Sequence, residues 1–388
     1  MDNYPDTGGP LLGFGRNAQD PYRGLITDEG AAVIPLDARG TGFWLTGLFG
    51  DPTVSQTNAL GHIAFAEQPA GGATITLNGV TWTFASGTAG ANETQIGGDL
   101  DATLTALASD LNGSADAEIS KCTYTANMAD DRLEIQFDTA GTTGNAFTLA
   151  ASANSGGTAS AATLTGGGYR HEWLSGGDDI PSFTFEIGHP QLITPVFFRH
   201  LGTVMESLAF EMGQEGPANA TVQLVAQGEE KASATIDATP PTTFALKRFS
   251  QGRGFIRRGG TALAQVTGGN LTFSNNLERV RVIRDDGKIA GADPTIATCT
   301  GAMTVRFDGS SLVTEAASGA PVELEYGFST VDGWRLTFEL FRVFLPKPKY
   351  AVSGPGGVEA SFDWRAAYDE ANAAMLRARL LNDVASYA

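Results

Sequence analysis

Three segments between Ser182 and Gln227 alternate between apolar and polar side chains. Alternation with period two predicts strands that bury one face. Gly213–Pro217 joins the second segment to the third, and its composition favours a turn. The sequence therefore predicts an antiparallel meander. The expected faces comprise Phe183, Phe185 and Ile187 in the first segment, Val204, Glu206, Leu208 and Phe210 in the second, and Val222, Leu224 and Ala226 in the third.

Further strands are expected towards the end of the chain. A hairpin should pair Val322–Phe328 with Trp334–Leu345, because Asp332-Gly333 favours a tight turn. The alternation in the second of these strands changes phase at Leu340-Phe341, which predicts a β-bulge or a strand that switches faces. Other strands are expected at Asn270–Ser274, at Arg279–Arg284 and around Met303, Val305 and Phe307, whereas Gly42–Gly50 fits a short helix or a buried strand.

The last part of the chain changes to a helical period. Trp364, Tyr368, Ala371, Met375 and Ala378 lie at spacings of three or four residues, with charged residues largely off this stripe. This pattern predicts a C-terminal amphipathic helix over about Asp363–Asp383. Its face of Trp364, Tyr368 and Met375 should pack on the protein's own sheet or on that of a neighbour.

Residues 67–168 have a separate plan of elements and predict an inserted α+β domain of the order β-β-α-β-β-β. The segment has eleven acidic and two basic residues, a net charge of −9. The outer chain should form a discontinuous main domain from residues 21–66 and 169–388, after an N-terminal arm at residues 1–20. The elements expected in the insert are a hairpin over Ile75–Phe84 with Asn78-Gly79 in its turn, a helix over Gly98–Leu111, a hairpin of Lys121–Ala126 and Arg132–Phe137, a strand at Phe147–Ala150 and a flexible linker from Ala151 to Gly168.

The composition supports a mainly β protein with partners. Glycine accounts for 49 of 388 residues, about twice the usual share of roughly 7%, which suits short strands and many turns. The net charge of −18 excludes nucleic-acid binding through the overall field. We expect no signal peptide and no membrane span, because the first residues are acidic and broken by Pro and Gly, and no apolar run is long enough.

A search for catalytic and metal-binding patterns gives no candidate. Cys122 and Cys299 are too far apart in sequence for a metal or redox motif, and no two of the four histidines have the spacing of metal ligands on a helix. No nucleophile elbow or phosphate-binding loop occurs in the expected context. Paired carboxylates of the glycosidase kind stay open, because 43 acidic residues allow many pairs. We therefore expect no catalytic residue, metal or cofactor.

Ala238–Leu277 contains basic residues and no acidic one. The stretch is rich in Gly and should contain a long exposed loop. Three readings are open: a solvated loop, a contact with nucleic acid, or a docking surface for the acidic surface of an identical neighbour. The third is favoured, because a chain at −18 that polymerises needs to offset repulsion. The candidate contact residues are Lys247, Arg248, Arg253, Arg257 and Arg258.

Four segments of the outer chain resemble the tail tube proteins of long-tailed bacteriophages and of related gene transfer agents. They are Ile180–Pro190, Gly202–Phe210, Ser274–Leu277 and Asp286–Pro294. In the insert, Thr74–Phe84 and Thr139–Phe147 are similar to a small domain that is repeated in many phage tail proteins. These motifs are signatures of a fold, so no catalytic residue is carried over.

The resemblance implies an antiparallel β-sandwich or barrel with a flanking helix. It implies a structural protein of the virion tail, assembled in the bacterial host cytoplasm, whose hexameric rings stack into a tube. The implied partners are the protein itself, a tape-measure protein in the lumen, a tail terminator and distal tail or baseplate proteins. DNA would pass through the lumen without specific binding. The insert should face outward, since a ring interior has no room for six such domains.

A second function class stays open on sequence alone. A β-rich carbohydrate-binding protein or adhesin, at a tail tip or on a cell surface, would show the same strand pattern and the same lack of catalytic motifs. A depolymerase is a third reading. Rings or tubes of uniform diameter would favour the first class, and a monomer that binds glycans would favour the second.

Overall fold

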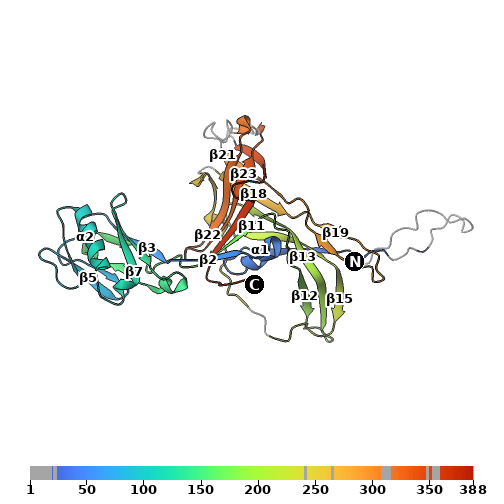
Figure 1. Cartoon of the computed structure of the whole chain (residues 1–388), viewed down its shortest axis with the longest axis horizontal. Helices are drawn as coiled ribbons and strands as arrows, with labels where there is room; N and C mark the ends of the chain where they lie inside the picture. The colour runs from blue at the N-terminus through green and yellow to red at the C-terminus, as the bar shows by residue number, and fades with distance from the viewer. Residues whose placement is uncertain are drawn as a thin grey trace, which may run out of the picture.

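A computed structural model describes residues 20, 24–239, 243–263, 266–306, 316–346, 349–351 and 359–387. The expected N-terminal arm, apart from Asp20, and the strand position Phe307 lie outside these residues. Sixteen strands form one hydrogen-bonded network that folds over into two packed layers (Figure 1). The layers are joined where Val343 and Phe344 pair with Ala366 and Arg365. The predicted mainly β, antiparallel sandwich is confirmed.

The first layer, called layer A, contains the predicted meander. Its strand order is β1-β14-β13-β18-β21-β25, with β24 beside β25. All of its pairs are antiparallel. The strands are β1 (Asp28–Pro35), β13 (Val196–Met212), β14 (Asn219–Ala226), β18 (Val266–Ser274), β21 (Thr298–Arg306), β24 (Lys349–Ala351) and β25 (Glu359–Ala366).

The second layer, called layer B, contains the predicted hairpin near the end of the chain. β22 pairs with β23, and their register shifts between Val322 and Leu324, which confirms the β-bulge expected at Leu340-Phe341. The layer has the order β17-β16-β22-β23-β26-β11-β2. Its strands are β2 (Thr53–Thr57), β11 (Gly168–Leu174), β16 (Gly254–Arg258), β17 (Thr261–Ala262), β22 (Val322–Ser329), β23 (Arg335–Phe344) and β26 (Leu376–Asn382).

Aromatic side chains fill the space between the layers. Phe210 of layer A lies 5.0 Å from Phe338 and 5.9 Å from Phe328, both of layer B, between ring centroids. The segment Gly42–Gly50, which fitted either a helix or a strand, lies largely in the helix α1 (Thr41–Phe49). Its Leu45 and Leu48 join the same core. The core thus takes up Phe183, Phe185, Leu208, Phe210 and Val222 of the predicted faces, whereas Ile187 is 54% exposed and was wrongly expected to be buried.

A β-bulge in β13 changes one predicted face. Its pairing with β14 shifts register between Met205 and Ser207. Because a slip of one residue reverses the side on which side chains lie, Met205 joins the main core with Leu208. Val204 instead packs with Val225 in a separate small cluster. The expectation that Val204 shares a face with Leu208 is therefore wrong.

The first half of β13 leaves layer A and forms a three-stranded extension, which we call the extension. It pairs with β12 (Phe183–His189) on one side and with β15 (Gly228–Ala232) on the other. Figure 1 shows these strands extending below the sandwich. A separate two-stranded ladder of β19 (Glu278–Val280) and β20 (Gly291–Asp293) lies outside both layers.

The segment between β2 and β11 forms a body with its own hydrophobic cluster, well separated from the sandwich in Figure 1. The hairpin turn has the expected positive φ angles, 47° at Asn78 and 85° at Gly79. Two four-stranded sheets, β10-β3-β8-β7 and β6-β5-β4-β9, pack with α2. The elements are β3 (Leu60–Phe65), β4 (Thr74–Leu77), β5 (Val80–Ala85), β6 (Glu93–Gln95), α2 (Leu100–Asn112), β7 (Cys122–Asn127), β8 (Arg132–Phe137), β9 (Leu149–Ala151) and β10 (Gly157–Ala159). Short 3-10 turns are η1 (Ile119–Lys121), η2 (Thr142–Ala146) and η3 (Ala153–Ser155) in this body and η4 (Gln251–Arg253) in the main chain.

Both ends of this body differ from the expected ones. β3 precedes the predicted start of the insert at residue 67, but it pairs with β8 and β10. The expected flexible linker contains β10, and its Leu164 is fully buried. Small polar residues form this stretch, so composition predicted a linker, but β3 gives its backbone a hydrogen-bonding partner. The compact body therefore extends from about residue 59 to 165.

The predicted C-terminal helix is wrong. The structure places two strands, β25 and β26, where the helix was expected, with a turn between them. Trp364 is buried on β25 and Met375 is buried just before β26, whereas Tyr368 is 58% exposed in the turn. The same residues fit a period of two, because burial alternates strictly along β25 and along β26. Layers A and B supply partners on both sides, so tertiary pairing overrides helix propensity.

Candidate assembly surfaces

The five basic residues predicted as contacts do not form one loop. Lys247 lies 2.7 Å from Asp332 between Nζ and Oδ2. Arg248 is exposed, and its guanidinium donates a hydrogen bond to Asn219. Arg253 is also exposed, at the end of η4. The expected long loop is partly wrong, because Gly254–Arg258 forms a strand of layer B.

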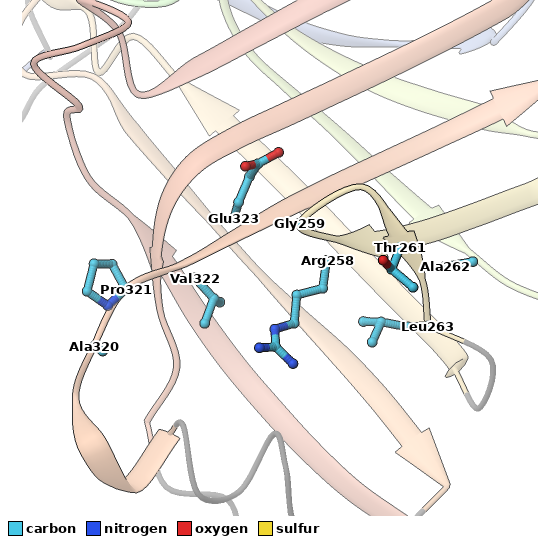
Figure 2. A pocket seen from close by; sticks show the side chains of 9 residues that line it. All are labelled: Arg258, Gly259, Thr261, Ala262, Leu263, Ala320, Pro321, Val322 and Glu323. Carbon is cyan, nitrogen blue, oxygen red and sulfur yellow. The ribbon is translucent and has the colours of Figure 1, made fainter.

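Arg257 and Arg258 lie on the strand β16 and are half-buried. The guanidinium of Arg257 lies 4.4 Å above the ring of Phe255 and 3.7 Å from Glu325. Figure 2 shows a hollow lined by residues that include Arg258 and Glu323, whose side chains point in opposite directions. The hollow has a volume of about 630 Å³, and its other lining residues are Gly259, Thr261, Ala262, Leu263, Ala320, Pro321 and Val322. Such a lining offers one cation, one carboxylate and one hydroxyl, and no nucleophile–base pair.

The tip of the extension exposes apolar side chains. Leu192 is 55% exposed and Ile193 fully exposed, between the ends of β12 and β13. Ile187 on β12 is 54% exposed. Midway along the extension, the Nε of Arg199 donates a hydrogen bond to Glu186 of the paired strand over 2.9 Å. Sequence analysis missed this tip, although the pair of prolines around Leu192-Ile193 marks an apolar turn.

Among the described strands, β1 and β2 each have an open edge. β1 pairs with β14 along its whole length and has no partner strand on its other side. β2 pairs only with β11, and four of its five residues are exposed. Open edges present unpaired N–H and C=O groups that can pair with another chain. The extension and these edges are therefore surfaces suited to assembly.

The three residues expected to pack the C-terminal helix have separate environments. The indole N–H of Trp364 donates to the Tyr326 hydroxyl over 2.6 Å, inside the core. The backbone N–H of Met375 donates to the Ser175 hydroxyl over 3.1 Å. Tyr368 makes no such core contact and remains exposed. The structure thus brings Trp364 and Met375 into one core and leaves Tyr368 out of it.

Potential catalytic groups do not converge among the described residues. No group of three His, Cys, Asp or Glu side chains there could hold a metal ion. Burial raises the pKa of Cys122 to about 12 and raises that of Cys299 as well, so neither thiol ionises readily. His171 is fully buried, and burial lowers its pKa, while its Nε2 donates to the carbonyl oxygen of Val384 over 2.8 Å. These groups have structural roles.

No described helix is long and apolar enough to cross a membrane.

The comparison with protein families decides between the function classes. A model of the phage tail tube protein family matches residues 6–366. The chain belongs to this family. No curated protein matches it. The chain is thus a structural component of the virion tail, and the resemblance of its outer segments to tail tube proteins is confirmed.

Proposed function

We propose that the chain polymerises into stacked rings of six subunits, and that the tube conducts DNA into the host during ejection. The tube would belong to a phage or gene transfer agent particle and would assemble in the bacterial host cytoplasm. Its lumen would hold a tape-measure protein, and its ends would bind a tail terminator and distal tail or baseplate proteins. Family membership supports a tube. The ring order of six and the named partners are part of the proposal.

One observation carries the proposal: the fold has a projecting apolar tip in addition to its open edges. The fully exposed Ile193 and the largely exposed Leu192 lie at the tip of the extension, away from the core. A contact between an apolar projection and a different surface of an identical copy is head-to-tail, and such contacts generate rings or filaments. Open edges such as β1 would join neighbours within a ring by strand pairing.

The substitution Ile193→Asp tests the role of the extension. Burying an apolar side chain of this size contributes about 1.5–3 kcal/mol, so its loss should raise the concentration needed for assembly by about tenfold or more. We expect a folded subunit, because the side chain has no core contact. Assembly is measured by sedimentation and electron microscopy over a concentration series, with circular dichroism as a check of folding. Ile193→Leu keeps the apolar surface and should assemble normally. Tubes of Ile193→Asp at wild-type concentrations would refute the role.

The basic residues are proposed as contacts between subunits, with Arg248 and Arg253 as the two that are exposed. Reversing both, Arg248→Glu with Arg253→Glu, should leave the fold intact because exposed charges contribute little to stability. Tube elongation should become strongly dependent on salt or fail, since like charges would then meet. Turbidity and microscopy at two ionic strengths measure this. Unchanged elongation at both ionic strengths would exclude these arginines from the interface.

A further inference from the structure

The outward face of layer A has a broad area without ionisable side chains. Across β14, β13, β18 and β21, alternate residues point away from the core, and the register places them side by side. Thr272, for example, lies opposite Ala209 on one side and Thr300 on the other. The described residues of this area are Thr221, Gln223, Ser207, Ala209, Asn270, Thr272, Ser274, Thr298, Thr300, Ala302 and Thr304. Every one carries a hydroxyl, an amide or a methyl group.

The margins of this area differ from its centre. Glu211 lies at the end of β13 and Arg306 at the end of β21. Asp363 and Arg365 lie on β25, at one side of the area. At the bulge between Met205 and Ser207 the uncharged area ends, because the cluster of Val204, Val225, Leu277 and Ile289 lies on this side of the sheet. The uncharged area therefore has defined limits, in a chain whose net charge is −18.

The outward face of layer B has the opposite character. Arg379 lies 2.8 Å from Glu172 and 3.2 Å from Glu339, between side-chain nitrogen and oxygen atoms. Arg377 lies 2.7 Å from the same Glu339. Arg335 also lies on this face, and burial together with the nearby Arg257 lowers its pKa. This face therefore carries charges of both signs, with Arg377 and Arg379 paired to carboxylates.

The inserted body leaves from layer B. It begins after β2 and returns at β11, which pair with each other at the edge of that layer. Figure 1 shows the body on the side of β2 and β22, away from β13 and β18 of layer A. In a closed ring, a body of about a hundred residues needs space outside the wall. A body placed outside the wall would turn layer B outward and layer A inward.

We propose that the outward face of layer A lines the lumen of the tube, as an uncharged surface of hydroxyl, amide and methyl groups. This inference rests on the proposed function. A DNA backbone binds protein mainly through cations that replace its counterions, and the lining has none over this area. It also has no carboxylates there, so it neither holds nor repels the phosphates. DNA then passes because the wall is neutral, and the margins carry the charges.

Cysteine labelling of assembled tubes tests the lining. Thr272→Cys and Thr300→Cys place thiols within the area, and Thr81→Cys places one on an exposed position of the inserted body. The native Cys122 and Cys299 are buried and give a low background. Each variant is treated with a small maleimide and with a maleimide carried on a long polyethylene glycol chain, before and after assembly.

We expect all three thiols of unassembled subunits to react with both reagents. In tubes, the thiols at positions 272 and 300 should react with the small reagent and at least tenfold more slowly with the large one, whereas position 81 should react with both. Equal reaction of all positions with the large reagent would place layer A outside. Protection of positions 272 and 300 from both reagents would place the area inside a subunit contact. Failure of wild-type protein to form tubes would instead overturn the proposed function, which the labelling does not address.

Discussion

Among single residues, Trp364 of layer A makes a central contact with Tyr326 of layer B. It is 3% exposed, its indole donates to the Tyr326 hydroxyl, and the two rings lie 5.5 Å apart. The backbone of Gly301 approaches it so closely that a side chain there would overlap the indole. A large aromatic side chain with a satisfied polar group contributes strongly to a core. The sequence could show that Trp364 packs, but not which element carries it.

Trp364→Ala should therefore lower the free energy of unfolding by about 3–5 kcal/mol. It removes the ring and leaves the buried Tyr326 hydroxyl without its donor. Tyr368→Ala is the matched control, because its side chain is 58% exposed, and it should change stability by no more than about 0.5 kcal/mol. Urea unfolding of unassembled subunits measures both. Equal losses in the two variants would contradict this placement of the side chains.

Among the elements, the C-terminal strands β25 and β26 show why the sequence fits both a helix and a pair of strands. Ala360, Phe362, Trp364 and Ala366 alternate inward along β25, and their charged neighbours face out. Residues from Trp364 onward also fit a helical stripe, and Ala, Arg and Leu favour helices. The turn at Asp369–Ala374 connects the two strands, and β25 then pairs with β21 of layer A while β26 pairs with β23 of layer B. Hairpins with strong turn residues, such as Asn78-Gly79, were predictable because the turn itself is encoded locally.

The substitution Ala373→Gly distinguishes a turn at this position from a helix, because its effect on the free energy of unfolding has a different sign in the two cases. Ala373 has a φ of 50°, in the left-handed region that side chains disfavour. Glycine relieves that strain and loses more chain entropy, so stability should stay unchanged or rise by up to about 1 kcal/mol. Within a helix, the same change would cost about 1 kcal/mol. Ala371→Gly is the control, because Ala371 is exposed in the same turn but does not have a positive φ. A loss of about 1 kcal/mol for Ala373→Gly in urea unfolding would favour the helix.

The features that matter for assembly belong to the whole molecule. The uncharged face around Thr272 depends on how strands from different parts of the chain pair, so local patterns do not reveal it. The apolar tip at Ile193 lies in a local turn between β12 and β13, which the flanking prolines mark in the sequence. Bulges, such as that at Met205–Ser207, change faces without a clear signal in composition. The sequence predicts a separate insert because its charge and its pattern of elements differ from those of the outer chain, but the structure has four strands before α2 and four after it, not the predicted two and three. The limits of the insert were not predictable, because β3 finds its partners far along the chain.

Removal of the inserted body tests its proposed outward position. A variant that lacks residues 59–165 joins the ends of β2 and β11, which already pair. Its sandwich keeps a complete core, because the cluster of the insert shares no residue with the main one. We expect tubes with an unchanged lumen and a smaller outer diameter. A widened lumen, or subunits that no longer assemble, would mean that the body belongs to the wall.

Electron microscopy of the purified full-length chain, at rising protein concentration, tests the central claim most directly. The account predicts rings and tubes of one diameter, with a continuous lumen and regularly spaced outward projections from the inserted bodies. Cross-sections should show six projections in each ring. A monodisperse monomer at every concentration, especially one that binds glycans, would contradict the claim.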